Sequence, residues 1–241
     1  MALKQNFCIK KSASTLRKTR WLYGLQLTHT HIAETQFLAI RTNTLLQDGF
    51  TMTEFQTNGY VLVKGFYKPA ELDTISRYLE NALKRYPENN QGGKAGDSSR
   101  ISWYADPLIE VILKNALPDV ETVTGLKLDP SYSFTRVYQK DDELPPHVDR
   151  PACEISVTSH IATVGKPWPI YMKAPGKEPT VHYLEPGDAC IYKGCEVTHW
   201  REKAVDTDVN VQVMLHYVDK NGQNAEHKFD KRAALGLSKW S

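Results

Sequence analysis

Two histidines and one aspartate are the side chains in this sequence best suited to hold a metal ion. His147 and Asp149 stand two positions apart, so on an extended segment their side chains leave the same face. His199 follows 50 residues after Asp149. Two imidazoles and one carboxylate can hold ferrous iron on one side and leave its remaining positions open. We therefore predict a metal site built from these three residues.

The His-x-Asp pair alone is a weak signal, because the chain contains eight histidines and such pairs also occur in polar surface loops. Its surroundings strengthen it. Aromatic and β-branched residues predict strands at 131–138 and 153–161, on either side of the pair. A turn followed by a strand is predicted at 184–192, and a further strand at 209–218. The predicted ligands thus belong to an ordered series of strands.

The order of these motifs resembles the iron(II)/2-oxoglutarate dioxygenases, most closely their prolyl-4-hydroxylase-type branch. The motifs are Arg-Val-Tyr at 136–138, His-Val-Asp at 147–149, Pro-Gly-Asp at 186–188, His199, and Tyr-Val-Asp at 217–219. The resemblance covers about residues 55–220. It implies a mostly β fold with flanking α-helices, a double-stranded β-helix (a cupin-like jelly-roll barrel) with the metal at its mouth. It also implies that His147, Asp149 and His199 are the iron ligands and the catalytic centre.

The cosubstrate site departs from the family pattern. The resembled enzymes usually present Arg or Lys on the last strand, roughly ten residues after the second histidine, to bind the far carboxylate of 2-oxoglutarate. Here residues 208–212 contain no basic side chain, and alignment of the strand ends puts Asn210 at that place. A dianion inside a barrel needs a cationic partner, so another basic residue must replace it.

Arg136 is the first candidate for this role. It lies two residues before Tyr138, which matches a cosubstrate-contacting tyrosine of the family, and the family's first and last strands are neighbours. Arg201 is the second candidate, because it stands two residues after His199 and should share that ligand's face. Further candidates are Lys193 and Arg150.

The remaining histidines of the predicted barrel have simpler interpretations. His182 and His216 lack a carboxylate partner at a matching spacing, so we expect ordinary barrel residues. His160 falls near another family contact position, although a hydrogen-bonded interior histidine explains it equally well.

The resemblance implies Fe(II), 2-oxoglutarate and O2 as reactants and hydroxylation of a C–H bond, since halogenation generally needs the position of Asp149 vacant. The substrate classes left open are a free amino acid, a peptidyl residue and a small metabolite. A cupin-type metal-binding jelly roll with an isomerase, lyase or ligand-binding role is the alternative, favoured by the missing base. A catalytically inactive interaction module is a third class. The presence of all three predicted metal ligands argues against it.

Bulk properties exclude several other classes. The chain of 241 residues has room for one domain with a sizeable core, and its net charge of +2 does not indicate nucleic acid or an acidic membrane surface. Four cysteines without a CxxC pair favour a reducing compartment, and we expect a cytoplasmic protein. Residues 1–33 are basic and lack acidic residues, which suits an organelle transit segment. We therefore separate residues 1–51, a targeting segment or an upstream-start artefact, from a domain at 52–241.

Local patterns also predict the elements around the barrel. We expect the first strand within 53–66, a helix opening at Pro69, and a polar Gly-rich loop at 86–99. A helix at 101–123 should be broken at its two prolines. The polar tail 220–241 should wrap the outside of the domain.

Overall fold

The structure, a computed structural model, describes residues 49–85 and 101–237. Its helices are α2 (Gly49–Asn58), α3 (Pro69–Arg85) and α4 (Pro107–Thr124), with 3-10 turns η1 (Pro151–Cys153) and η2 (Ala225–Lys231). Its strands are β1 (Tyr60–Val63), β2 (Ile101–Tyr104), β3 (Leu128–Gln139), β4 (Leu144–His147), β5 (Ile155–Gly165), β6 (Ile170–Lys173), β7 (Thr180–His182), β8 (Ala189–Lys193), β9 (Thr198–Arg201) and β10 (Thr207–Asp219).

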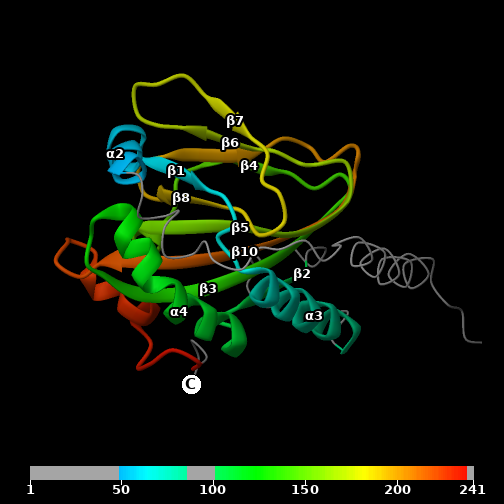
Figure 1. The fold of residues 1–241 in the computed structure, drawn as a ribbon, viewed down its shortest axis with the longest axis horizontal. Helices are drawn as coiled ribbons and strands as arrows, with labels where there is room; N and C mark the ends of the chain where they lie inside the picture. Colours follow the sequence, from blue (N-terminus) through cyan, green and yellow to red (C-terminus); the bar gives the residue numbers. More distant parts are fainter. Residues whose placement is uncertain (1–48, 86–100, 238–241) are drawn as a thin grey trace, which may run out of the picture.

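Two antiparallel sheets form the barrel. The larger sheet has the order β1-β8-β5-β10-β3-β2, and the smaller has the order β4-β9-β6-β7. Figure 1 shows the smaller sheet on one side of the larger one and helices α3 and α4 on the other. From β3 onward the chain crosses repeatedly between the two sheets, as in a double-stranded β-helix, with β6 and β7 the one consecutive pair in the same sheet. The fold class predicted from the sequence is confirmed.

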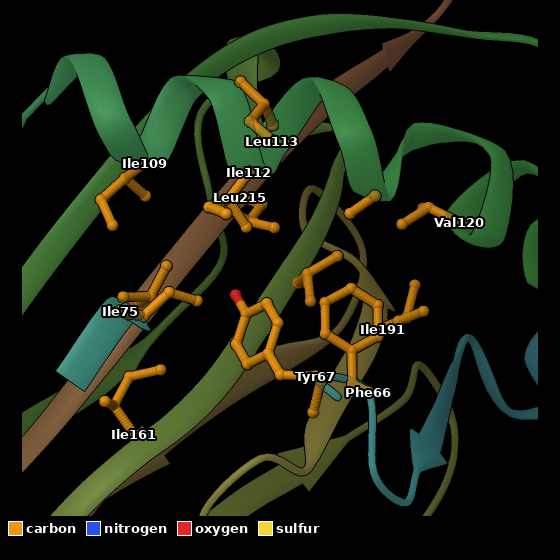
Figure 2. Close-up of a cluster of buried hydrophobic side chains, with 14 of the residues drawn as sticks. Phe66, Tyr67, Ile75, Ile109, Ile112, Leu113, Val120, Ile161, Ile191 and Leu215 are labelled. Atoms are coloured by element: carbon orange, nitrogen blue, oxygen red, sulfur yellow. The ribbon is translucent and has the colours of Figure 1, made fainter. Parts of the chain in front are cut away.

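Strand β10 packs one of its faces into the main core and presents the other face to a cavity. Its odd-numbered residues, such as Val213 and Leu215, are fully buried in the main core. Figure 2 shows Leu215 beside Ile109 and Leu113 of α4 and Ile75 of α3. Each such side chain contributes about 1.5–3 kcal/mol on burial. The even-numbered residues point the other way, because side chains alternate along a strand, and three of them, Gln212, Met214 and His216, line a cavity.

Helix α4 is anchored at both ends. Asp106 caps its start by accepting hydrogen bonds from the backbone N–H groups of Leu108 and Ile109, and it also accepts one from Tyr78 on α3. Gly125 ends the helix in the left-handed conformation that glycine adopts at little cost. The helix continues through Pro118, so the break predicted there is wrong. Burial of the residues on both sides of Pro118 outweighs the lost backbone hydrogen bond.

Two predicted elements need correction. Residues 101–104 form edge strand β2 against β3, not the start of a helix, because pairing with β3 outweighs local propensity. Residues 53–58 belong to helix α2, and the predicted strand is confined to β1. Gly59 ends α2 with a positive φ of 76° and donates to the Phe55 carbonyl.

The other strand predictions and the helix opening at Pro69 are confirmed. The predicted loop 86–99 and almost all of the predicted extension 1–51 lie outside the described residues. Across 49–85 and 101–237, no helix is both long enough and apolar enough to cross a membrane.

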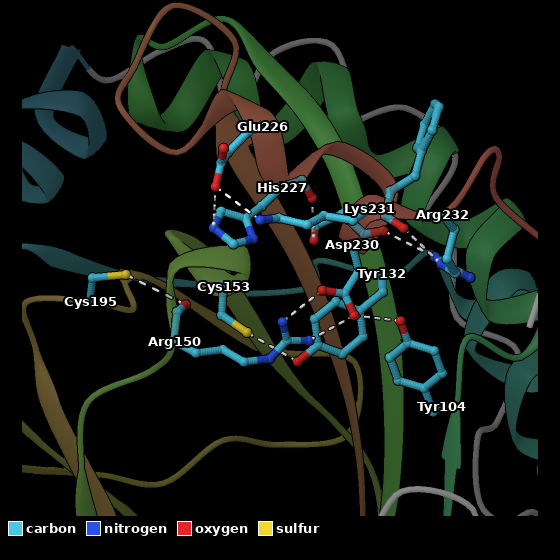
Figure 3. Close-up of polar contacts among 12 residues, drawn as sticks. Tyr104, Tyr132, Arg150, Cys153, Cys195, Glu226, His227, Asp230, Lys231 and Arg232 are labelled. Carbon is cyan, nitrogen blue, oxygen red and sulfur yellow. Dashed lines mark hydrogen bonds and ion pairs between the residues drawn. The ribbon is translucent and has the colours of Figure 1, made fainter. Parts of the chain in front are cut away.

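The C-terminal tail is fixed to the barrel by buried charges. Asp230, 3% exposed, accepts two hydrogen bonds from the Arg150 guanidinium at 2.6 and 2.9 Å and one from the Tyr104 hydroxyl at 2.5 Å. Arg232 pairs with the buried Glu110 of α4 at 2.5 Å. Figure 3 shows Asp230 of the tail together with Arg150, which follows β4, and Tyr104 of β2. The described part of the tail therefore has the structural role expected of it.

Asp230→Ala is expected to lower the free energy of unfolding by about 2–4 kcal/mol, because it leaves the Arg150 charge without its bidentate partner. Urea denaturation measures this loss. Glu226→Ala is the matched control, since Glu226 is an exposed residue of the same tail and its ion pair with Lys231 lies in solvent. Equal stability of the two variants would contradict a structural role for the network.

Candidate metal and cosubstrate site

The three predicted metal ligands converge at one end of the smaller sheet. Strands β4 and β9 pair so that His147 lies directly opposite His199. Asp149 follows β4, and its Oδ1 lies 3.8 Å from Nε2 of His147 and 3.7 Å from Nε2 of His199. All three ligand atoms lie within 4.8 Å of one another. This spacing accommodates a divalent ion with bonds of about 2.1 Å to nitrogen and oxygen.

Both imidazoles are oriented for metal binding. Nδ1 of His147 lies 2.8 Å from the Pro145 carbonyl, and Nδ1 of His199 lies 3.1 Å from the Val197 carbonyl. A proton on each Nδ1 satisfies these contacts and leaves the Nε2 lone pairs facing Asp149. Burial lowers the pKa of His199, which keeps this imidazole neutral and able to bind a metal.

The Asp149 carboxylate is held from two sides. Its Oδ2 accepts a hydrogen bond of 2.9 Å from the Ser156 hydroxyl, and its backbone N–H donates to the Gly194 carbonyl at 2.8 Å. Gly194 also packs against it closely: a Cβ at this position would lie 2.0 Å from the Cys153 carbonyl oxygen and 2.6 Å from Oδ2 of Asp149. Only glycine fits beside this predicted ligand.

Gly194→Ala is expected to displace Asp149, lower metal affinity at least tenfold and destabilise the fold by about 1–3 kcal/mol through overpacking. Isothermal titration with Mn(II) and thermal melting measure the two effects. Cys195→Ser is the control, since the Cys195 thiol contacts the Arg150 carbonyl and not Asp149. Wild-type metal affinity in Gly194→Ala would contradict the close packing.

The cavity beside the three ligands contains a buried cation. Arg201 is 3% exposed, and it lines the cavity together with Arg136 and Tyr138. One guanidinium nitrogen, Nη1, donates to the Trp168 carbonyl at 2.6 Å. The other, Nη2, is buried without a hydrogen-bond partner, and no carboxylate in the described parts of the chain pairs with Arg201. Burial lowers its pKa to about 10, so the group remains charged at neutral pH.

The position of the family's usual base holds a neutral amide network. Asn210 is 1% exposed, donates to the Thr163 hydroxyl at 2.9 Å and accepts from Gln212 at 2.6 Å. It pairs with Tyr138 across β3 and β10, so these two strands are neighbours as expected. Arg136 lies opposite Gln212, with its guanidinium 4.7 Å from the Tyr138 ring centre.

The other basic candidates are engaged elsewhere. Arg150 is bound to Asp230, and Lys193 lies 3.5 Å from Glu196. His160 is an interior histidine, with contacts of 2.6 Å to the Leu184 carbonyl and to the Thr163 hydroxyl.

The sequence interpretation missed two polar residues of the cavity. His216 was expected to be an ordinary barrel residue, but it lines the cavity and contacts Ser156. Gln212 was noted only for not being basic. Alternation along the last strand was the available signal, because it places both residues on the face that points away from the core.

Comparison with known proteins gives similarity in structure alone. No protein-family model and no curated protein matches the chain. Among solved structures, iron-bound EctD from S. alaskensis has a TM-score of 0.61 at 11% identity, covering 79% of this chain and 87% of that one. A 2OG-Fe(II) oxygenase-family oxidoreductase from Burkholderia pseudomallei has a TM-score of 0.58 at 16% identity, covering 80% and 98%. The chain has the fold of the iron(II)/2-oxoglutarate oxygenases.

A third similar structure shows that this fold is used for different reactions. The epimerase SnoN, in complex with Fe3+, alpha ketoglutarate and nogalamycin RO, has a TM-score of 0.59 at 11% identity, covering 78% of this chain and 91% of that one. These similarities do not distinguish among branches of the superfamily. The prolyl-4-hydroxylase-type branch therefore stays a prediction.

Proposed function

We propose that the protein is an iron(II)- and 2-oxoglutarate-dependent oxygenase that hydroxylates a C–H bond of a small molecule or a peptidyl residue. One observation carries the proposal: a single cavity contains both the His147, Asp149 and His199 ligand set and the buried, carboxylate-free cation Arg201. The similar structures named above include one with bound iron and one with iron and alpha ketoglutarate.

Arg201 is the proposed partner of the 2-oxoglutarate carboxylate farthest from the metal. A buried guanidinium without a carboxylate is costly unless a ligand supplies one, and its planar donors match a carboxylate in a bidentate manner. Strand β9 carries both His199 and Arg201 on the face that lines the cavity. A single strand would therefore position a metal ligand and the cosubstrate anchor. This places Arg201 ahead of Arg136, the first candidate from the sequence.

The chain's own contributions to such a reaction are placement and a dry cavity. Bound iron and 2-oxoglutarate would supply the activation of O2, which no side chain can provide. Arg201 would fix the orientation of the cosubstrate, while the buried Tyr138, Trp168 and Ile170 exclude water around it. The open side of the cavity, next to the 38%-exposed side chain of His147, is left for the substrate.

Hydroxylation is proposed because Asp149 is present as the third ligand. The coordination position that a halide would need is therefore not vacant. The structure also weakens the main reason for the cupin-type alternative. That alternative depended on the missing base at Asn210, and Arg201 supplies a cation from another strand.

The deciding experiment is anaerobic titration of the Fe(II)-loaded protein with 2-oxoglutarate. Chelation of iron by the 2-oxo acid should produce a weak visible charge-transfer band that saturates at one equivalent. Succinate formation on admission of O2 is then expected, even without a substrate. Iron binding with no band and no succinate would reject the proposed function and favour a metal-binding jelly roll of another kind.

A further inference from the structure

A short hydrogen-bonded chain connects the proposed metal ligand Asp149 to a buried histidine of the last strand. Ser156 on β5 lies directly opposite His216 on β10 in the larger sheet. The Ser156 hydroxyl oxygen is 2.9 Å from Oδ2 of Asp149, 2.9 Å from Nδ1 of His216 and 3.0 Å from the Cys153 carbonyl oxygen. Ser156 is fully buried and His216 is 5% exposed, so water does not compete freely for these contacts.

The number of protons available determines which groups donate and which accept in these hydrogen bonds. The Asp149 carboxylate and the Cys153 carbonyl can only accept hydrogen bonds, and the Ser156 hydroxyl has one proton to donate. That proton goes preferentially to Asp149, because a bond to a charged acceptor is roughly twice as strong as one to a neutral acceptor. Ser156 must then accept from His216, so His216 carries its proton on Nδ1.

The environment of His216 is consistent with this single protonation state. Burial lowers the pKa of His216 to about 4, so its imidazole is neutral with one N–H. Its ring lies against Tyr132 with a centroid distance of 4.5 Å, which limits rotation. The N–H is therefore held toward Ser156.

We infer that His216 is a positioning residue that acts through Ser156 to hold Asp149 as a ligand through one oxygen. The hydrogen bond from Ser156 occupies Oδ2 of Asp149. Oδ1, the oxygen nearest both His147 and His199, is left to face the metal. A carboxylate free to turn could bind through both oxygens and fill a coordination position that the cosubstrate needs. This inference rests on the ligand assignment in the proposed function.

The first test is Mn(II) affinity, measured by the electron paramagnetic resonance signal of the free ion. Ser156→Ala and His216→Phe are each expected to weaken Mn(II) binding about 10–100-fold, the usual cost of losing a contact that orients a ligand. The double variant should be no weaker than either single variant, because both remove the same chain. Full additivity of the two losses would overturn the inference.

Asparagine tests the donor itself. The amide nitrogen of asparagine can take the place of an imidazole Nδ1–H, so His216→Asn should bind Mn(II) within about threefold of the wild type. Affinity as low as that of His216→Phe would overturn the inference, as would wild-type affinity in a folded His216→Phe or Ser156→Ala. If His216→Phe does not fold, the smaller change Ser156→Ala carries the test.

Ser159→Ala is the matched control for the loss of a buried serine. Ser159 lies on the same strand but belongs to the opposite face, where it donates to the Val213 carbonyl at 2.7 Å and contacts Tyr67. We expect lower stability but unchanged Mn(II) affinity. A wild type that binds Mn(II) but not 2-oxoglutarate would reject the proposed function alone. A wild type that binds no divalent metal would overturn both.

Discussion

Arg201→Gln is expected to weaken 2-oxoglutarate binding by roughly a hundredfold or more, with iron affinity unchanged. The substitution removes the charge and the fork of donors that would hold the cosubstrate carboxylate. Hydrogen bonds to charged groups contribute about 1.5–3 kcal/mol each, so the loss of two corresponds to at least a factor of about 100. The anaerobic charge-transfer titration gives the dissociation constant of 2-oxoglutarate, and a Mn(II) titration gives that of the metal.

Stability should distinguish an anchor from a structural arginine. In the absence of cosubstrate, Arg201 is a buried cation without a carboxylate, and its burial opposes folding. We therefore expect the apo form of Arg201→Gln to be as stable as the wild type within about 1 kcal/mol, despite losing the bond to the Trp168 carbonyl. Added 2-oxoglutarate should raise the melting temperature of the iron-loaded wild type only.

Arg136→Gln is the comparison that decides between the two candidate anchors. Arg136 lines the same cavity but is less buried than Arg201 and stacks on Tyr138. We expect its substitution to weaken 2-oxoglutarate binding by less than about tenfold, the effect of one partly solvated charge nearby. A larger loss in Arg136→Gln than in Arg201→Gln would restore Arg136 as the anchor.

His147→Ala is expected to reduce metal affinity by more than a hundredfold. Removing a ligand should exceed the 10–100-fold loss that follows from removing a residue behind a ligand. The side chain of His147 is 38% exposed, so the fold should lose little stability. Metal content after gel filtration and Mn(II) titration both report the effect.

Val148→Ala controls for disturbance of this loop. Val148 stands between the two proposed ligands His147 and Asp149 and is 48% exposed, so its truncation removes no proposed ligand and little packing. It should bind Mn(II) as the wild type does. Stoichiometric metal in His147→Ala would show that the ligand assignment is wrong.

Much of the fold could be predicted because the barrel strands carry strong local signals. Aromatic and β-branched residues identified 131–138 and 153–161, a turn followed by a strand pattern identified 184–192, and partial alternation identified 209–218. The errors fell where local signals were weak or misleading. Residues 101–104 are a strand only because β3 offers an edge to pair with, which a local pattern does not contain.

The sequence by itself determined the candidate metal ligands and the architecture that would carry them. The two-residue spacing of His147 and Asp149 places both side chains on one face of an extended segment, which is a local property. His199 was predicted to be the third ligand from the order of the motifs along the sequence. Its position opposite His147 requires the pairing of β4 with β9, which the structure provides.

Only the tertiary structure showed which arginine is the better candidate for the anchor and which side chains contact Asp149. The sequence ranked Arg136 ahead of Arg201, because charge is a property of a residue but burial without a partner is a property of its surroundings. The contact between Ser156 and His216 joins residues 60 positions apart through strand pairing. Spacing identifies groups that share a face of one strand. Folding alone brings groups from different strands together and removes the water between them.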